Sequence, residues 1–393
     1  MATKFRFKNA DGTTVDFEDY YVRADYFRSG NAWIVGNSSY GGIGDNTTVD
    51  KSSPVQTITF GSNWKQVSAD NNWHVAGVKT DGTLWLWGYN ARGQLGDNSV
   101  TDRSSPVQTV ARGTNWVQVS QGYSITGAIK TDGTLWLWGS NYNGELGDNT
   151  VTLKSSPVQT VTRGNNWKQV ACGGGCAFAI KTDGTLWGMG AGGYGNLGTN
   201  DTLLYSSPVQ TVAYGTNWKQ VSANIYHTAA VKTDGTLWLW GANDYGQLGD
   251  NTQVYKSSPI QTITYGTNWK QVSCGSYHTA AVKTDGTLWS WGENTYGTMG
   301  ENAVNTQYSS PVQTIAYGTT WKQVSAGQYF TTAVKTDGTL WAWGLNNYGN
   351  LGTNEIYVNY SSPVQTVMYG TNWKQVSCGY YKMIAVQYQD DYQ

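Results

Sequence analysis

The stretch Trp269-Lys-Gln-Val-Ser-Cys-Gly-Ser-Tyr-His-Thr-Ala-Ala-Val-Lys-Thr-Asp-Gly-Thr-Leu-Trp-Ser-Trp-Gly292 decides the fold, because close copies of it follow one another along the chain. The string Trp-x-Gln-Val occurs seven times, first at Trp64 and last at Trp373. Ser-Ser-Pro-(Val/Ile)-Gln-Thr also occurs seven times, at intervals of 51 or 52 residues. A fixed period of this length indicates a repeat architecture.

Each repeat predicts four short strands and no helix. Trp-Lys-Gln-Val-Ser alternates apolar and polar residues, as a half-buried strand does. A small apolar run, such as Thr279 to Lys283, follows it, and Thr-Asp-Gly-Thr supplies a tight turn. Leu-Trp-Ser-Trp-Gly then returns as a third strand, and the β-branched Pro-Val-Gln-Thr segment forms the fourth. Four strands per repeat, seven times over, predict an all-β, seven-bladed β-propeller.

The two ends of the chain predict how the ring closes. Lys-Thr-Asp-Gly-Thr-Leu-Trp occurs only six times, one copy fewer than the other strings. The C-terminal strands at Trp373 and at Met383 to Gln387 lack their two partners, which Ser29 to Gly36 and Pro54 to Thr57 can supply. We therefore expect one blade to be completed by strands from both termini, which leaves no exposed sheet edge in the ring.

The pattern from Cys274 to Gly300 resembles the regulator of chromosome condensation repeat family, in the variety found in bacterial and bacteriophage proteins. The resemblance covers residues 29–393 and implies a seven-bladed propeller with one blade shared between the termini. The founding member exchanges nucleotide through an inserted wedge and binds chromatin through basic tails. The nearly constant period here leaves no room for a wedge, and no basic tail is present. A photoreceptor of this family uses clustered tryptophans, but here almost all tryptophans occupy two repeated strand positions, which indicates core packing.

Composition excludes several classes of function. Only 13% of the residues are charged and the formal net charge is −1, so nothing predicts a general attraction to nucleic acid. The apolar runs are much shorter than the roughly 20 residues of a membrane span, and the N-terminus lacks the apolar segment of a secretory signal. We expect neither nucleic-acid binding nor membrane insertion.

No group of residues suggests catalysis, a metal or a cofactor. His74, His227 and His278 share one position of the repeat, where the other blades carry Ile, Cys, Phe or Lys, so a strand position facing a neighbouring loop explains them. Cysteines of a second repeat position alternate with alanine, as buried thiols do. The aspartates of the Leu-Gly-Asp-Asn loops lack the converging oxygens that calcium needs, which favours Asx turns. The chain is predicted not to be an enzyme.

The variable loops supply the candidate binding surface. Tyr and Arg recur in them, and protein interfaces enrich both residue types. Tyrosine rings also stack on sugars. The candidates are Tyr40, Arg92, Arg103, Arg112, Arg163, Tyr194, Tyr205, Tyr245, Tyr296, Tyr308, Tyr348 and Tyr360.

Residues 1–28 lie outside the repeats and precede a propeller domain at residues 29–393. Lys4 to Lys8 and Thr14 to Phe17 alternate around Asn-Ala-Asp-Gly, which predicts a β-hairpin. An isolated hairpin is marginally stable, so we expect this extension to dock on another surface. The candidate anchor residues are Phe5, Phe7, Val15, Phe17, Tyr20 and Tyr21.

Together these features favour a non-enzymatic virion surface protein of a bacteriophage. In this interpretation the N-terminal extension binds other proteins of the capsid or tail, and the propeller loops attach to a glycan or protein of the host surface. The alternative is a bacterial propeller, in the cytoplasm or outside the cell, that binds or inhibits another protein. Assembly into a homo-oligomer stays open in both interpretations.

Overall fold

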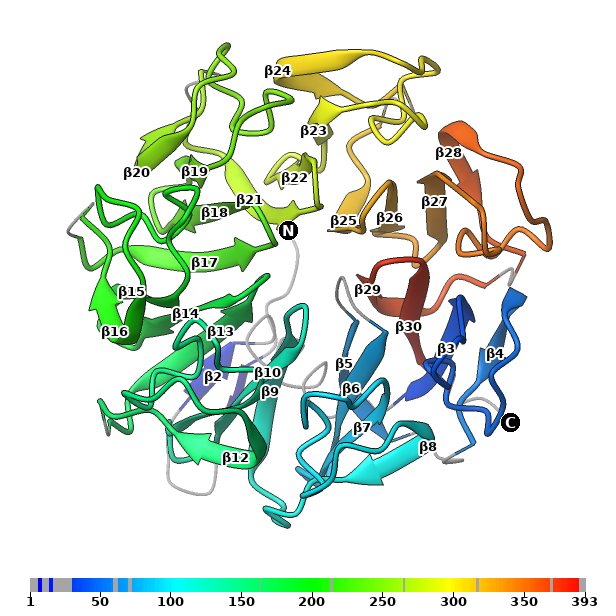
Figure 1. Cartoon of the computed structure of the whole chain (residues 1–393). Coiled ribbons are helices and arrows are strands. Elements are labelled where there is room, and N and C mark those ends of the chain that lie inside the picture. Colours follow the sequence, from blue (N-terminus) through cyan, green and yellow to red (C-terminus); the bar gives the residue numbers. More distant parts are fainter. Residues whose placement is uncertain are drawn as a thin grey trace.

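The computed structural model describes residues 6–8, 14–16, 30–58, 63–69, 73–162, 164–212, 215–263, 266–315, 318–367 and 370–388, and their regular structure is all β-strand. Figure 1 shows four-stranded sheets standing side by side around a central axis, as the blades of a propeller do. Each blade runs outward from a strand that begins with the Trp-x-Gln-Val string.

Three blades occupy the first half of the ring. From inner to outer strand they are β5 (Trp64–Ala69), β6 (His74–Lys79), β7 (Leu84–Gly88) and β8 (Arg103–Gln108); β9 (Trp116–Gln121), β10 (Ile125–Lys130), β11 (Leu135–Gly139) and β12 (Lys154–Gln159); and β13 (Trp167–Cys172), β14 (Cys176–Lys181), β15 (Leu186–Gly190) and β16 (Tyr205–Gln210).

Three further blades follow in chain order. They are β17 (Trp218–Ala223), β18 (His227–Lys232), β19 (Leu237–Gly241) and β20 (Lys256–Gln261); β21 (Trp269–Cys274), β22 (His278–Lys283), β23 (Leu288–Glu293) and β24 (Gln307–Gln313); and β25 (Trp321–Ala326), β26 (Phe330–Lys335), β27 (Leu340–Gly344) and β28 (Tyr360–Gln365).

The remaining blade joins the two ends of the ring, as predicted. Its inner strands are β29 (Trp373–Cys378) and β30 (Lys382–Tyr388), and its outer strands are β3 (Gly30–Gly36) and β4 (Lys51–Gln56). β3 pairs antiparallel with β30 from Gly30↔Tyr388 to Gly36↔Lys382, and β4 pairs with β3. Strands from opposite ends of the sequence therefore complete one sheet (Figure 1).

The predicted N-terminal hairpin is present in its backbone. β1 (Arg6–Lys8) pairs antiparallel with β2 (Thr14–Asp16), and Phe7 stands opposite Val15. Four of the proposed anchor residues, Phe5, Phe17, Tyr20 and Tyr21, lie outside the described residues.

The Thr-Asp-Gly-Thr segments form the tight turns between the second and third strands of six blades. In the turn after β22, the Asp285 carboxylate accepts hydrogen bonds from the Thr287 amide at 2.9 Å and from its hydroxyl at 2.7 Å. The same hydroxyl accepts a bond from the Trp289 indole. Gly286 adopts a φ of +81°, which favours glycine. These repeated aspartates therefore shape hairpins.

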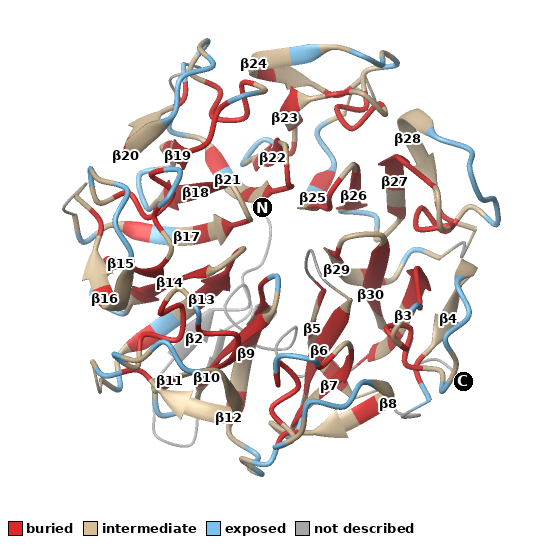
Figure 2. Ribbon diagram, viewed as in Figure 1, coloured by how far each residue is buried: buried red, intermediate tan, exposed pale blue. Residues whose placement is uncertain are grey.

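The hydrophobic core lies between neighbouring blades. Large side chains such as Trp269 and Trp291 are almost fully inaccessible to solvent, and Figure 2 shows buried residues along the inner three strands of the blades. The Trp291 indole donates a hydrogen bond of 2.8 Å to the Gln247 carbonyl oxygen of the preceding blade. The tryptophans thus pack blade against blade, as the repeated positions predicted.

A ring of glutamine side chains ties all the inner strands together. The Gln271 amide nitrogen donates to the Val324 carbonyl oxygen at 2.8 Å, and its amide oxygen accepts from the Val324 amide at 3.0 Å. The same two-bond bridge recurs between every pair of neighbouring blades. The seven glutamines are Gln66, Gln118, Gln169, Gln220, Gln271, Gln323 and Gln375. Because Gln375 bridges to Val67, the ring of hydrogen bonds is closed.

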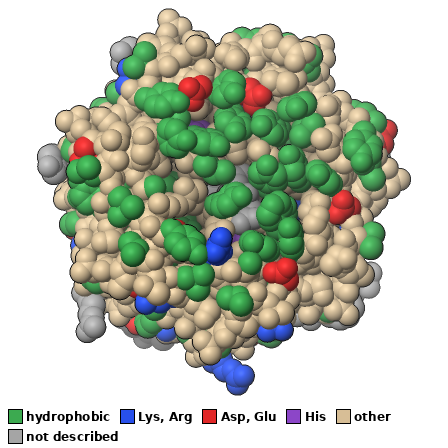
Figure 3. Space-filling view, viewed as in Figure 1, with side chains coloured by type: hydrophobic (Ala, Val, Ile, Leu, Met, Phe, Trp, Pro, Cys, Tyr) green, Lys and Arg blue, Asp and Glu red, His purple; other side chains and the backbone are tan. Residues whose placement is uncertain are grey.

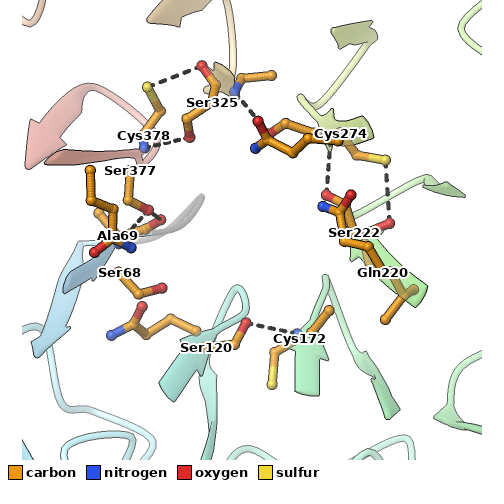
Figure 4. A pocket seen from close by; sticks show the side chains of 18 of the residues that line it. Ser68, Ala69, Ser120, Cys172, Gln220, Ser222, Cys274, Ser325, Ser377 and Cys378 are labelled. Atoms are coloured by element: carbon orange, nitrogen blue, oxygen red, sulfur yellow. Dashed lines mark hydrogen bonds between the residues drawn. The ribbon is translucent and has the colours of Figure 1, made fainter. Parts of the chain in front are cut away.

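Serine hydroxyls reinforce several of these bridges next to the channel. Ser325, for example, accepts a hydrogen bond of 2.9 Å from the Cys378 amide, as Figure 4 shows around the channel. The four cysteines are buried and unbridged, and burial raises the pKa of the Cys378 thiol to about 12. This agrees with the predicted packing role of the thiols.

Each of the three histidines lies on the second strand of its blade and contacts the next blade. The His278 Nε2 lies 2.9 Å from the Thr331 hydroxyl, which donates to the Thr298 carbonyl oxygen. The Thr331 oxygen therefore accepts a hydrogen bond from Nε2–H. Burial lowers the pKa of His278 to about 3. The histidines are neutral bridges between blades.

Replacing one glutamine of the ring should destabilise the whole propeller. In a Gln271→Ala variant the Val324 amide and carbonyl lose their partners, and we expect a loss of about 1–2 kcal/mol in the free energy of unfolding. Chemical denaturation followed by tryptophan fluorescence measures it. The matched control is Lys270→Ala, an exposed neighbour that should change stability little. Equal unfolding midpoints for the two variants would contradict the bridging role.

The buried histidines should make the fold sensitive to acid. An unfolded histidine takes up a proton near pH 6.5, whereas folded His278 takes it up only near pH 3. The unfolded chain therefore binds more protons in this window, and stability falls as the pH falls through it. A His278→Phe variant, which copies Phe330 at the same position of another blade, should lose stability less steeply between pH 6.5 and 3 than the native chain. Thermal unfolding at several pH values tests this, and an unchanged slope would argue against it.

Candidate functional site

Two loops of each blade build one face of the ring, opposite the Thr-Asp-Gly hairpins. One loop joins the inner strand to the second strand, and the other follows the third strand with a glycine turn that reads Asn-x-Tyr-Gly in three blades. Gly246 of such a turn has a φ of +77°, and a Cβ there would lie 2.5 Å from the Ser309 Cα of the next blade. The turn is therefore pressed against its neighbour, which fixes the position of Tyr245 beside it.

Each tyrosine of these turns packs against an aromatic residue of the next blade. The ring centroids of Tyr245 and Tyr277 lie 5.3 Å apart with the planes at 69°. Tyr277 also stacks on Tyr226 at 5.2 Å and on Tyr329 at 5.6 Å, with angles of 22° and 25°. Such edge-to-face and offset contacts stabilise aromatic pairs.

These contacts extend over most of the face as an aromatic arc. The blade that joins the termini continues the arc to both of its neighbours: its Tyr381 lies 4.7 Å from Tyr348 of the preceding blade, and its Tyr380 and Tyr40 contact Trp73 of the next blade. Figure 3 shows hydrophobic side chains, a class in which it includes tyrosine, gathered around the centre of this face. The aromatic arc consists of Tyr194, Tyr226, Tyr245, Tyr277, Tyr296, Tyr329, Tyr348, Tyr380, Tyr381, Trp73, Tyr40 and Tyr89.

The hydroxyls of Tyr277 and Tyr329, at the centre of the arc, stay protonated at neutral pH. Burial and the neighbouring Tyr226 raise the pKa of Tyr277, and burial together with Glu293 raises the pKa of Tyr329 to about 12. The rings of the arc are half-buried, except for that of Tyr194, which is exposed. The arc therefore offers both apolar ring surface and hydroxyl donors to a ligand.

A pocket of about 500 Å³ opens where the arc is interrupted. Gly174 and Gly175 take the places that Ile225 and Tyr226 hold in the next blade, so no large side chain fills this space. The buried Glu145 carboxylate lines the pocket and accepts a hydrogen bond from the Asn143 amide at 2.7 Å. Burial raises its pKa. The pocket combines tyrosine rings with polar groups, as binding pockets commonly do.

Arg92 lies at the edge of this pocket and is exposed. Its guanidinium donates to the Tyr142 hydroxyl at 2.7 Å and lies 5.1 Å from the centroid of that ring. The pair adds a charged, flat contact surface beside the aromatic arc.

The structure brings together half of the residues proposed as a binding surface. Tyr40, Arg92, Tyr194, Tyr245, Tyr296 and Tyr348 lie on the aromatic face.

Four other candidates begin or adjoin the outer strands, where each holds an acidic side chain of its own blade. Arg103 forms an ion pair with Asp97 at 2.7 Å, and the Tyr205 hydroxyl donates to Asp201 at 2.8 Å. Tyr308 and Tyr360 bond in the same way to Glu301 and Glu355. These contacts hold the loops that precede the outer strands. Where such a loop reads Leu-Gly-Asp-Asn, its aspartate forms the expected Asx turn, as Asp97 and Asp148 do. Arg112 is exposed in the loop before β9, and Arg163 lies outside the described residues.

Sequence reasoning missed the inner half of the arc. Tyr226, Tyr277, Tyr329 and Tyr381 each directly precede the histidine position of the repeat, as Trp73 does. An aromatic residue at this position in five blades was the available signal. This signal could not be read as a binding surface from the sequence, because the aromatic side chains meet at the centre of the face only once the ring has closed.

Lys382 is buried beneath this face without a hydrogen-bond partner for its amine in the described part of the chain. It occupies the histidine position of its blade. A Cβ at Gly42 would lie 2.2 Å from the Lys382 Nζ, so the amine fills the space that Gln94 or Gln247 fills in other blades. Burial lowers its pKa to about 7, an effect that Asp50 partly opposes.

Neither a metal centre nor a membrane helix emerges from the described residues. Within those ranges, no group of three or more His, Cys, Asp or Glu side chains could hold a metal ion. The same part of the chain holds no helix of the length and apolar character needed to cross a membrane.

Comparisons with known proteins agree with the architecture. A family model for the regulator of chromosome condensation (RCC1) repeat matches residues 81–129, 132–180, 183–231, 234–282, 285–334 and 337–386. The ultraviolet-B receptor UVR8 of Arabidopsis thaliana is 33% identical over 321 residues, 80% of this chain and 72% of the receptor. Human WBSCR16 superposes with a TM-score of 0.82 at 20% identity, over 92% of this chain and 100% of its own. Prp20p of Saccharomyces cerevisiae superposes with a TM-score of 0.81 at 18% identity, over 95% of each chain.

Removing the buried amine should change how stability depends on pH. Folded Lys382 loses its proton near pH 7 and an unfolded lysine near pH 10.5, so the unfolded chain binds more protons between these values. The free energy of unfolding should therefore rise with pH between the two pKa values, by about 1.4 kcal/mol per pH unit. A Lys382→Met variant should be more stable than the native chain at pH 7 and should lose this rise. Lys322→Met is the control at an exposed position, and a rise that survives in Lys382→Met would overturn the assignment.

Proposed function

The chain belongs to the regulator of chromosome condensation repeat family, and from its architecture we propose that it is a protein-interaction module whose partner binds the aromatic face. The observation that carries this proposal is the aromatic arc itself. A set of half-buried tyrosines and a tryptophan surrounds one mouth of the ring, next to a pocket.

The chemistry of the face is that of a protein interface. Tyrosine, tryptophan and arginine dominate the binding energy of such interfaces because they bury much area at modest entropic cost. The contacts within the arc hold its rings before a partner arrives, which lowers the entropic cost of binding further. The pocket beside Arg92 and Glu145 is suited to receive a single side chain of the partner.

The relatives support a binding role in general terms. The structural study of Prp20p concerns its binding to Gsp1p and histones, and the plant relative is named as an ultraviolet-B receptor. We do not extend light reception to this chain, because tryptophans such as Trp269 and Trp291 serve as packing between blades.

The location in a bacteriophage virion stays a prediction from the sequence resemblance. The relatives described above come from a plant, a human and a yeast. A protein-interaction module is compatible with a virion, where the partner would be another particle protein, and with a cellular partner.

Truncating the centre of the arc should weaken partner binding without unfolding the ring. We expect a Tyr226→Ala/Tyr277→Ala variant to lose at least about tenfold in affinity, since such aromatic anchors are worth about 2 kcal/mol or more. A partner is first identified by cross-linking the native chain in lysate of its source, and its affinity is then measured by calorimetry with both purified proteins.

The matched control is Tyr205→Phe/Tyr360→Phe, which changes tyrosines that hold outer loops away from the arc. It should bind as the native chain does. A partner that binds the arc variant with native affinity would refute the proposed face.

A further inference from the structure

The residue after the first tryptophan of each inner strand is a lysine in six blades and Val117 in the seventh. In β21 the pairing runs Trp269↔Lys283 and then Gln271↔Val282, so Lys270 is an extra residue with no partner on the neighbouring strand. The same irregularity recurs in the other inner strands. A β-bulge of this kind redirects a side chain out of the ladder.

The repeated bulges place these lysines around the other mouth of the channel. The tryptophan that precedes the lysine donates its amide to a hairpin glycine of the preceding blade in five of these six blades, as Trp269 does to Gly235 at 3.0 Å. This end of the inner strands therefore lies on the hairpin face, away from the aromatic arc. The channel itself, about 230 Å³, is lined by the polar glutamines and serines of the inner strands (Figure 4).

Four of the lysines follow one another on consecutive blades and are exposed to solvent. We call them the lysine ring, and they are Lys168, Lys219, Lys270 and Lys322. Burial lowers the pKa of Lys270, and the positive charges of Lys322 and Lys219 lower it further. The ammonium groups are therefore close enough to repel one another.

No carboxylate of the described residues forms an ion pair with the lysine ring. The acidic residues of this face are the hairpin aspartates, and each binds its own turn. Asp234, for example, accepts two hydrogen bonds from Thr236 and interacts electrostatically with Lys232, which lies over two tryptophan rings. The charge of the ring thus faces solvent.

The fold does not need lysine at these positions. Val117 occupies the same bulge in β9, and its blade has the same four strands and glutamine bridge as the others. Neighbouring like charges without a counter-ion cost stability. A ligand of opposite charge accounts for their presence.

We propose that the lysine ring binds an acidic segment of a polypeptide, a run of Asp or Glu side chains laid across the mouth of the channel. This site is separate from the aromatic face and independent of the partner proposed there. Lysines alone form the ring, whereas arginine forks and helix N-termini, which select phosphate, are absent among the described residues of this mouth. The tryptophans nearby are covered by the hairpin lysines, as Trp218 and Trp238 are by Lys232, so they offer no platform for stacking bases.

The test measures binding of a fluorescein-labelled poly-glutamate peptide by fluorescence anisotropy, with the full chain. The native chain should bind it, and raised salt should weaken the binding because the contacts are exposed charge pairs. A Lys168→Gln/Lys219→Gln/Lys270→Gln/Lys322→Gln variant should lose at least about tenfold in affinity. Thermal unfolding checks that this variant remains folded.

A variant that is expected to bind the peptide more tightly tests the proposal even if the quadruple variant does not fold. Val117→Lys adds a lysine at the same bulge position of the blade beside Lys168 and should tighten peptide binding by about twofold to fivefold. The Tyr226→Ala/Tyr277→Ala variant should bind the peptide as the native chain does, which separates this site from the aromatic face. Native affinity in the quadruple variant, no effect of Val117→Lys, or tighter binding of a single-stranded oligonucleotide of equal charge would each overturn the proposal.

Discussion

The two-bond bridge from a glutamine amide to the backbone of the next inner strand is the constraint on which the rest of this structure depends. The inner strands of neighbouring blades do not pair with one another, so their facing backbone groups need partners from side chains. Glutamine carries one donor and one acceptor at the right reach, and Gln375 closes the circle on Val67. The bridge fixes both the depth and the rotation of each blade relative to its neighbours.

Because the blades are held at the same position along the central axis, equivalent residues of the repeat meet on the same face of the ring. Because every inner strand enters and leaves the ring at the same height, residues 51 or 52 positions apart in sequence meet around a common centre. One end of the strands assembles tyrosines such as Tyr226 and Tyr277 into a stack, and the other end assembles Lys219 and Lys270. The residues that occupy one position of the repeat thus form a ring of side chains around the central axis. A residue that differs in one blade therefore leaves a gap in that ring or changes its charge.

The sequence was sufficient to predict the strands, the repeat number and the joining of the ends, because each rests on local patterns that recur. β3 pairs with β30 where the missing Thr-Asp-Gly copy required it. The site was harder to predict because sharing a face depends on loop direction. Tyr205 and Tyr245 looked alike as variable tyrosines, yet Tyr205 is bound to Asp201 at the outer strand and Tyr245 packs toward the centre. Only the closed ring separates the two environments.

The near-zero net charge also could not show which charged residues share a face of the ring. A formal charge of −1 argued against a general attraction to nucleic acid, but a sum over the chain carries no information on where the charges lie. Acidic loop residues such as Asp97 and Glu145 belong to the aromatic side, whereas the exposed bulge lysines belong to the hairpin side. Both faces also carry the opposite charge, but it is engaged there: Asp97 pairs with Arg103 on the aromatic side, and the hairpin aspartates, such as Asp234, bind their own turns on the other side. The groups that stay free therefore give each face a different chemistry toward a ligand.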